Sequence, residues 1–303
     1  MAGTGIAVSE GFGYLLDPGL REVFWGEYNA VPSLIPSLFN VQGSDKAVEY
    51  DLGIGDMSDF ENFSNIGKIQ YDTPEQLWRV SYTHTEYAKG FQIERKLFED
   101  NLYSVMNDRA VDLGRAAWRT REKKGASMFN NATTTAGYDG VALVSNSHPL
   151  SPSNASVQDN YFALALSSAN LSTVRLAMMK FTDDRGNLAN VMPDLLLVPP
   201  ELEETAWQIV ENPTRYQPGS ANLTAEFHQG RYQILPWNQL TDTNRWFLVD
   251  SRLMRRFVKW YDRVPLEFAA IQDFDTLVAK WRAYMRFSFG WSDWRWIAGS
   301  EPS

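Results

Sequence analysis

The side chains best suited to acid–base or metal chemistry are three histidines, His84, His148 and His228. They lie far apart in the chain, and none has the His-x-x-x-His or His-Glu-x-x-His spacing that places two metal ligands on one helix face. We therefore predict no metal site and no catalytic histidine. Each ring is expected at the surface or partly buried.

The glycine-rich loops that cradle phosphate groups are incomplete. Gly67-Lys68 lacks the upstream glycine and the following Ser or Thr of a P-loop, and Gly53-Ile-Gly55 stops short of a dinucleotide-binding fingerprint. No Gly-x-Ser-x-Gly nucleophile elbow occurs. The sequence thus predicts no catalytic residue and no bound cofactor.

Two further patterns have both a chemical and a structural interpretation. Asp183-Asp184-Arg185-Gly186 suits a cation site or a helix end followed by a turn, and we favour the turn. Near the C-terminus, basic and aromatic residues alternate and suit either single-stranded nucleic acid or a strand with one buried face. We favour the strand, whose members are Arg282, Arg286 and Arg295 among Trp281, Trp291, Trp294 and Trp296.

Composition narrows the class of protein. The 303 residues carry 28 Lys and Arg against 37 Asp and Glu, a net charge of −9, with 14% aromatic residues and no Cys. The aromatic content excludes general disorder, and the length allows one large domain or two modest ones. The lack of Cys excludes disulfides, thiolate metal sites and a Cys nucleophile. The acidic balance argues against a protein whose main task is to grip nucleic acid.

Targeting and membrane signals are not visible in the sequence. The first ten residues lack the basic start and apolar run of a secretory signal, and no stretch of about 18 apolar residues occurs. We expect a protein that is made in the cytosol and does not span a membrane.

Residues 1–44 are predicted to form a largely irregular arm. They are rich in Gly, Pro and Ser, and Pro18, Pro32 and Pro36 interrupt any long helix, although residues 20–28 have room for two turns. The spaced apolar residues of this stretch need cover. We expect the arm to pack along another surface, for example that of another subunit.

Residues 45–90 alternate at strand spacing and predict an extended β-hairpin. Two runs with period 2, at 47–52 and 76–84, flank a polar stretch full of turn formers. Residues 45–75 carry eight acidic residues against Lys46 and Lys68, a net charge of −6 on about a tenth of the chain.

Residues 91–131 change to helical spacing and contain no Pro. They predict one helix of roughly 30 residues, about 45 Å long, with Gly114 and Gly125 as its weak points. The second half is basic, because six Lys and Arg outnumber Asp112 and Glu122 to give a net charge of +4.

The remaining chain alternates helices with short strands and ends in strand-like aromatic segments. Helices are predicted at 171–184 and 200–210, and strands at 194–198, 232–235 and 246–250. Seven of the eleven Trp residues lie from Trp237 onward, which indicates a core or an interface in the C-terminal part.

Several short stretches between residues 44 and 250 carry a family resemblance. They are Ser44-Asp-Lys-Ala-Val-Glu49, Gly53-Ile-Gly-Asp-Met57, Tyr87-Ala-Lys-Gly-Phe-Gln-Ile-Glu94, Leu113-Gly-Arg-Ala-Ala117, Asn130-Asn131, Asp139-Gly-Val-Ala-Leu143, Ser147-His-Pro149, Asp183-Asp-Arg-Gly186, Pro193-Asp-Leu-Leu-Leu-Val-Pro-Pro-Glu-Leu202 and Trp246-Phe-Leu-Val-Asp250. In this order the chain resembles a tailed-phage major capsid protein of the Hong Kong 97-type fold, within it the Mu-like major head subunit family.

The resemblance implies an α+β fold whose parts follow the chain in five segments. These are an N-terminal arm (1–44), an extended loop made by the β-hairpin (45–90), a peripheral domain with the long spine helix (91–164), an inserted axial α/β domain (165–250), and a return to the peripheral domain (251–303).

The resemblance also implies a structural function. Such a subunit assembles into the hexamers and pentamers of an icosahedral phage head, which encloses double-stranded DNA without sequence-specific binding. The implied partners are other copies of the chain, a separate scaffold, a portal and, in some relatives, decoration proteins. The implied location is the virion, with assembly in the host cytoplasm.

The uneven charge suggests how neighbouring subunits meet. We hypothesise that the acidic hairpin lies over the basic half of a neighbour's spine helix, with two solvated faces as an equally weighted alternative. The candidate contacts are Asp56, Asp59, Glu61, Lys68, Arg115, Arg119, Arg121, Lys123 and Lys124. Some relatives cross-link a lysine of this loop, but no acceptor motif accompanies Lys68 and no such bond is predicted.

Two other functions stay open at the level of sequence. One is an encapsulin-like cellular compartment shell, which shares the fold and would need a cargo-docking groove. The other is an α/β enzyme whose site leaves no recognisable motif. Electron microscopy separates the shells from the enzyme, because only shells form large closed or tubular particles.

Overall fold

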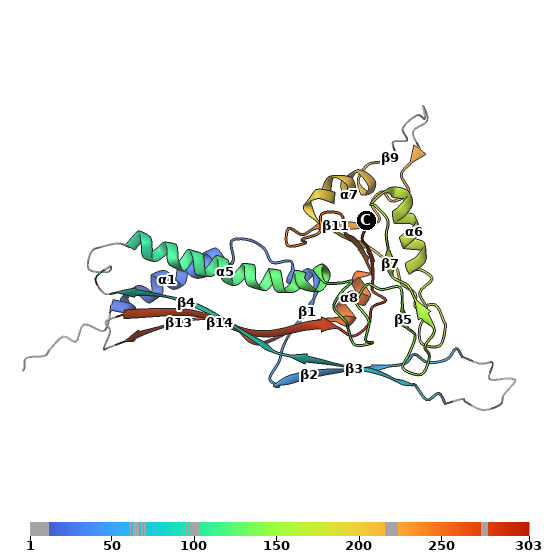
Figure 1. Ribbon diagram of the computed structural model, residues 1–303, viewed down its shortest axis with the longest axis horizontal. Coiled ribbons are helices and arrows are strands. Elements are labelled where there is room, and N and C mark those ends of the chain that lie inside the picture. The colour runs from blue at the N-terminus through green and yellow to red at the C-terminus, as the bar shows by residue number, and fades with distance from the viewer. Residues whose placement is uncertain are drawn as a thin grey trace, which may run out of the picture.

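The computed structural model describes residues 12–60, 62, 67, 69, 71–94, 96, 103–215, 224–273 and 278–302. An elongated helix–sheet layer carries a five-stranded lobe at one end, and a two-stranded hairpin lies beneath that end (Figure 1). This mixed arrangement of helices and sheets agrees with the α+β class expected from the sequence.

The helix–sheet layer is built on a four-stranded sheet with the order β1-β13-β14-β4. Its long central strands, β13 (Val258–Asp273) and β14 (Val278–Trp291), pair antiparallel, and β1 (Asn40–Gly43) and β4 (Thr85–Glu94) form the edges. Trp281 and Ala283 of β14 are buried beside Met106 and Leu113 of the long helix α5. Alternate side chains of β14 therefore form the floor on which the helices lie, as the period-2 pattern predicted.

The spine helix α5 (Tyr103–Asn130) has 28 residues, which confirms the helix predicted from residues 91–131. Its two glycines are sites of close approach. A Cβ atom on Gly114 would lie 2.6 Å from the carbonyl oxygen of Phe24, and one on Gly125 would lie 2.2 Å from the Cδ1 atom of Ile35. The positions that weaken the isolated helix are thus required by the segments that pack against it.

The prediction of an irregular arm was wrong for residues 12–28. They form the helix α1 (Phe12–Tyr28), which continues through Pro18. An internal proline removes a backbone hydrogen bond at a cost of about 3 kcal/mol, but Leu20 and Phe24 are fully buried against α5 and β13. Phe24 stacks on Phe268 at a centroid distance of 4.6 Å. Leu20 and Phe24 are therefore covered by their own chain.

The five-stranded lobe has the strand order β11-β8-β12-β15-β7. Every residue of β8 (Leu195–Val198), β12 (Trp246–Val249) and β15 (Ile297–Ser300) is buried. The edges are β7 (Tyr161–Phe162) and β11 (Gln233–Pro236), and the lobe also carries α6 (Ser168–Met178) and α7 (Glu203–Val210).

The composition of this sheet corrects the predicted segment boundaries. Residues 251–303 were assigned to the peripheral part, yet β15 lies in the lobe between β12 and β7. The physical reason is that Trp296 and Ile297 are entirely buried in the core of the lobe. The strand-like spacing was visible in the sequence, whereas the sheet that the last strand joins was not.

The remaining elements are short. They are α2 (Ile35–Leu38), β5 (His148–Pro149), β6 (Val157–Gln158), η1 (Pro200–Leu202), β9 (Thr214–Arg215), β10 (Thr224–Ala225) and α8 (Ser251–Phe257). None of the helices in the described ranges combines the length and apolarity needed to cross a membrane.

Candidate functional site

The hairpin consists of β2 (Val48–Ile54) and β3 (Gln76–Thr83), which pair antiparallel as predicted. Its inner face is attached to the same chain. The Trp78 ring meets the Tyr138 ring edge-on at 5.6 Å, and the Asp51 carboxylate lies 3.7 Å from the Lys259 ammonium group. The hairpin therefore has a fixed base on its own subunit.

The outer face of the hairpin carries an exposed apolar strip. Tyr50, Leu52 and Ile54 of β2 are 55%, 46% and 65% exposed, and Arg79 of β3 covers only part of the Tyr50 ring at 3.9 Å. Four apolar residues that follow or precede the strands are also exposed, namely Met57, Phe60, Ile69 and Tyr71. Contiguous exposed apolar residues mark interaction surfaces, because each exposes area that water solvates poorly. This strip was not predicted from the sequence, although its period-2 spacing was visible.

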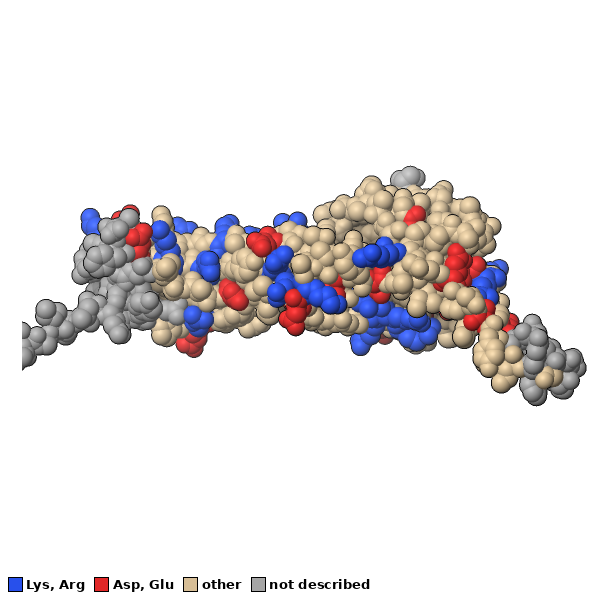
Figure 2. Space-filling view, turned by 90° about the horizontal axis from the view of Figure 1, so that it is seen from below, with Lys and Arg blue, Asp and Glu red and all other residues tan. Residues whose placement is uncertain are grey.

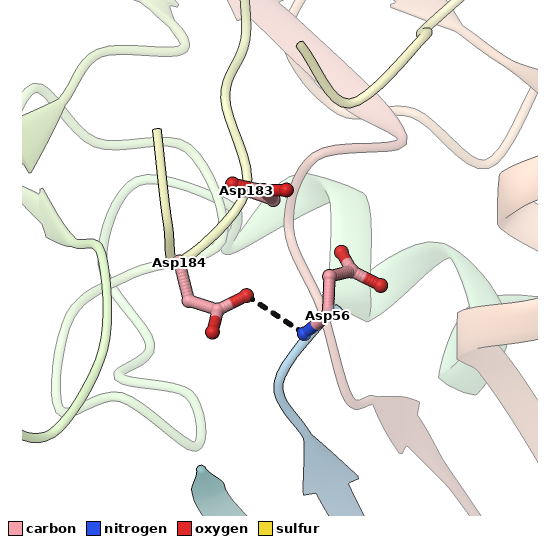
Figure 3. A group of neighbouring side chains, drawn as sticks. All are labelled: Asp56, Asp183 and Asp184. Carbon is pink, nitrogen blue, oxygen red and sulfur yellow. Dashed lines mark hydrogen bonds between the residues drawn. The ribbon is translucent and has the colours of Figure 1, made fainter. Parts of the chain in front are cut away.

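Three carboxylates meet where the hairpin leaves the body (Figure 3). Asp56 comes from the strand end of the hairpin, and Asp183 and Asp184 come from the turn of the lobe. One carboxylate oxygen from each lies within 4.8 Å of the others, and the Asp184 carboxylate accepts a 3.0 Å hydrogen bond from the Asp56 backbone N–H. Partial burial, followed by repulsion from Asp183 and Asp184, raises the pKa of Asp56.

Arg256 and Arg295 offset part of this negative charge at Asp56, and Arg185 fastens the neighbouring backbone. The Arg185 Nε group donates to the Asp56 carbonyl oxygen at 2.7 Å, and its Nη2 group pairs with Asp72 at 3.0 Å. Hydrogen bonds from the Ser58 backbone and from Arg185 lower the pKa of Asp72. The carboxylates could ligate a divalent cation, but these contacts explain the Asp183-to-Gly186 motif as a turn that fastens the hairpin to the lobe, with Gly186 at a φ of 89°.

Two of the basic residues proposed as inter-subunit contacts are engaged within the chain. The Arg121 guanidinium donates two hydrogen bonds to Asp262, at 2.9 and 2.8 Å, and lies over the Trp260 ring. Arg115 pairs with Glu27 of α1 at 2.9 Å. The sequence could not reveal these pairings, because both acidic partners lie far from α5 along the chain.

The other candidates remain exposed or fall outside the described residues. Arg119 and Lys123 are exposed and make no polar contact with the part of the chain that the structure describes, and Lys124 lies 5.5 Å from the Tyr87 ring. Asp59 is exposed on the hairpin. Glu61 and Lys68 lie outside the described residues.

Charge on the face that carries the hairpin is mixed. Seen from below, positive and negative side chains alternate along the molecule and do not separate into two single-sign halves (Figure 2). This view does not favour a single strongly charged docking patch on that face. The apolar strip is the more distinctive feature of the hairpin.

The three histidines are more buried than the sequence suggested. His148 is paired with Asp139 at 2.7 Å and stacked on Trp294, and the His228 ring lies 2.8 Å from the Ser172 hydroxyl. His84 is buried at the junction of β3 and β4. Each ring has a polar or aromatic partner inside the fold, so a structural role explains why the three histidines are buried.

Comparison with known proteins gives the fold a context. The family model for phage capsid proteins matches residues 79–300. The capsid of bacteriophage JBD30, decorated with minor capsid protein trimers, shares 16% identity at a TM-score of 0.55, over 75% of this chain and 98% of the phage chain. No curated protein sequence matches the chain.

Two further solved structures share the fold over nearly the whole chain. A virus-like particle from Pyrococcus furiosus gives a TM-score of 0.59 at 12% identity, over 94% of this chain and 98% of its own. A structure from Mycobacterium phage Patience gives 0.56 at 13% identity, over 96% and 88%. These likenesses show the Hong Kong 97-type fold, as the sequence predicted.

Proposed function

The chain belongs to the phage capsid protein family, and from this membership we propose that it is the repeating subunit of an icosahedral head. The membership itself establishes a structural capsid protein and not an enzyme, as expected from the sequence. We propose in addition that copies of the chain assemble into hexamers and pentamers around double-stranded DNA. The Mu-like subfamily remains a prediction.

The observation that supports self-assembly most directly is the apolar strip of the hairpin. We propose that Tyr50, Leu52 and Ile54 pack against a second copy of the chain. Their inner neighbours already bind the hairpin to its own subunit, so the outer face is positioned in advance and little ordering entropy is lost on docking. A closed shell repeats such a contact many times, so that each single contact can be modest.

We propose that the acidic hairpin pairs with the basic half of a neighbour's spine helix through fewer residues than the sequence suggested. Arg115 and Arg121 have partners within the subunit, so the basic residues left for a neighbouring hairpin are Arg119, Lys123 and Lys124. Asp59 is the matching exposed acid. Exposed ion pairs contribute at most about 1 kcal/mol each, so we assign them to the orientation of the contact and the apolar strip to its strength.

The proposed partners and location follow from the same role. We propose that a separate scaffold and a portal act during assembly in the host cytoplasm, and that decoration proteins bind the shell that becomes part of the virion. The JBD30 capsid is decorated with minor capsid protein trimers, which supports the decoration proposal by analogy of fold.

The test is electron microscopy of the purified full-length protein together with analysis of its contents. We expect closed particles or tubes with hexamer and pentamer symmetry, and double-stranded DNA in particles taken from an infected or induced host. Particles filled with foreign protein and free of DNA would favour the encapsulin-like compartment. A protein that stays monomeric at high concentration, with and without candidate scaffolds, would contradict the proposal.

A further inference from the structure

His84 occupies the one position between two strands that belong to different sheets. β3 ends at Thr83 and pairs with β2 in the hairpin, whereas β4 begins at Thr85 and pairs with β14 in the long sheet. The chain therefore passes from the hairpin into the helix–sheet layer at this residue. Any change in the angle between the two must be absorbed at or next to His84.

The ring of His84 connects three segments. Only 6% of the residue is exposed. Its Nδ1 atom lies 3.0 Å from the hydroxyl of Ser288 on β14, and its Nε2 atom lies 3.3 Å from the hydroxyl of Ser44, which follows β1. Both serines are buried as well. The ring thus fastens the base of the hairpin to the central strand of the sheet and to the segment that leads into β2.

The hydrogen bonds around the ring suit a neutral imidazole. The Ser44 hydroxyl donates its proton to the Glu49 carboxylate at 2.8 Å, and its oxygen, which also accepts from the Lys46 backbone N–H at 3.3 Å, can accept from His84 Nε2–H. Nδ1 then accepts a proton from the Ser288 hydroxyl. A neutral imidazole, with one donor and one acceptor, completes a directional chain from Ser288 through His84 and Ser44 to Glu49, whereas an imidazolium would donate to both serine oxygens.

The charges around the ring work against protonation. Arg286 of β14 and Arg263 of β13 lie close enough to repel an imidazolium, whereas Glu49 attracts it. Lys46 is paired with Glu49 at 3.0 Å, and Glu86 of β4 lies 3.8 Å from Arg286, so both nearby carboxylates are shared with another cation. Burial, followed by Arg286, lowers the pKa of His84 below 6.5.

The sign of the pH effect follows from this lowered pKa. Between the folded pKa and 6.5 an unfolded or detached histidine binds protons that the packed ring does not. The packed arrangement is therefore fully stable above pH 6.5 and loses stability as the pH falls through this range. Protonation also turns Nδ1 into a donor, so the Ser288 hydroxyl has to turn and accept from it, and it places a positive charge in a buried site near Arg286.

We propose that His84 is a pH-sensitive hinge residue that holds the hairpin at a defined angle to the long sheet while neutral and releases it when protonated. The inner-face contacts at Trp78 and Arg185 limit how far the released hairpin moves. The consequence is a subunit whose docking strip is presented in one orientation at neutral pH and in a broader range of orientations in acid.

The test is a distance measurement in the full-length subunit across this hinge. Because the chain has no Cys, spin labels attached to Ser58→Cys on the hairpin and Gln92→Cys on β4 report one distance by double electron–electron resonance. We expect a narrow distribution at pH 8 that broadens reversibly as the pH falls below 6.5. In His84→Gln, whose neutral amide keeps one donor and one acceptor, the distribution should not change over the same range.

Two further variants keep His84, so the proposal can be tested even if the His84→Gln protein does not fold. Glu49→Gln removes the attracting charge and should move the midpoint of broadening to lower pH, whereas Arg286→Gln removes a repelling charge and should move it to higher pH. These opposite shifts should match the His84 pKa measured by NMR. An unchanged wild-type distribution, equal broadening in His84→Gln, or shifts in the same direction would overturn the proposal.

Discussion

The five-stranded lobe and the hairpin both carry apolar side chains on their strands, with opposite results. In the lobe, Leu196 of β8 and Leu248 of β12 are completely buried because the chain supplies a second layer on both faces. In the hairpin, Leu52 and Ile54 stay exposed because the body of the subunit covers only the inner face. One region of the subunit is thus complete by itself, whereas the other leaves apolar side chains exposed for the proposed contact with a second copy.

The largest effect on subunit stability is expected in the core of the lobe. Trp296→Ala should lower the free energy of unfolding by about 3–5 kcal/mol, since the ring is fully buried and its Nε1 group donates to the Asp293 carbonyl oxygen at 2.7 Å. Trp207→Ala on α7, where the side chain is half exposed, is the control and should change it by less than about 1 kcal/mol. Denaturant unfolding of both variants measures the difference. Equal losses in the free energy of unfolding would mean that burial within the subunit does not determine the contributions of Trp296 and Trp207 to stability.

The next effect is expected at the joint between α5 and the lobe. Glu122 is buried and accepts hydrogen bonds from Ser33 Oγ at 2.5 Å and Trp237 Nε1 at 3.0 Å. Glu122→Ala should cost about 1–3 kcal/mol, because the buried indole N–H loses its acceptor. Asp112→Ala, which removes an exposed acid from the same helix, should be nearly neutral. A thermal unfolding series distinguishes them, and a stable Glu122→Ala protein would show that the joint does not depend on this carboxylate.

The hairpin should respond in the opposite way. The double variant Leu52→Ser, Ile54→Ser should leave the free energy of unfolding of the isolated subunit within about 0.5 kcal/mol per site, since both side chains are already solvated. It should nevertheless abolish or strongly reduce particle formation in a sedimentation assay. Leu176→Ser, an exposed leucine on α6, is the control and should assemble normally. Normal assembly of the double variant would disprove the docking role of the strip.

The smallest effect is expected at the carboxylate cluster. The folded pKa of Asp56 is raised, so its ionised form is disfavoured and the resulting penalty is complete once the pH exceeds that folded pKa. Asp56→Asn should therefore increase hydrogen-exchange protection at the end of β2 next to Asp56 slightly at pH 7. The gain should disappear as the pH falls below 3.8, where the carboxyl group is neutral in both states. Reduced protection at pH 7 would contradict this reasoning.

Local periodicity predicted much of the fold. The 28 residues of α5, the pairing of β2 with β3 and the buried run of β8 follow from spacing alone. The full length of helix α1 was not predicted, because Pro18 disfavours a helix locally. The sequence does not show that α5 and β13 cover Leu20 and Phe24. Long-range burial outweighed local propensity there.

The candidate contacts were harder to predict for a related reason. Net charge identified the hairpin and the spine helix as unusual, but it cannot tell a free arginine from one paired across the fold. Arg121 lies 141 positions from its partner Asp262, and nothing local signals the pair. The exposed strip had the opposite problem, since Leu52 and Ile54 have the spacing of buried residues and only the structure shows that their own chain leaves them uncovered.

The position of β15 has a consequence for the time course of synthesis. The strand completes its sheet between β12 and β7, although about 135 residues separate β7 from β15 along the chain. At about 5–20 residues per second, a ribosome takes on the order of ten seconds to produce that interval. During this time β7 lacks its one partner strand in the sheet, β15, and β12 also has an open edge once it has been made. We expect the nascent subunit to depend on chaperones until residues 297–300 emerge from the ribosome. Assembly with other copies is expected only after that point.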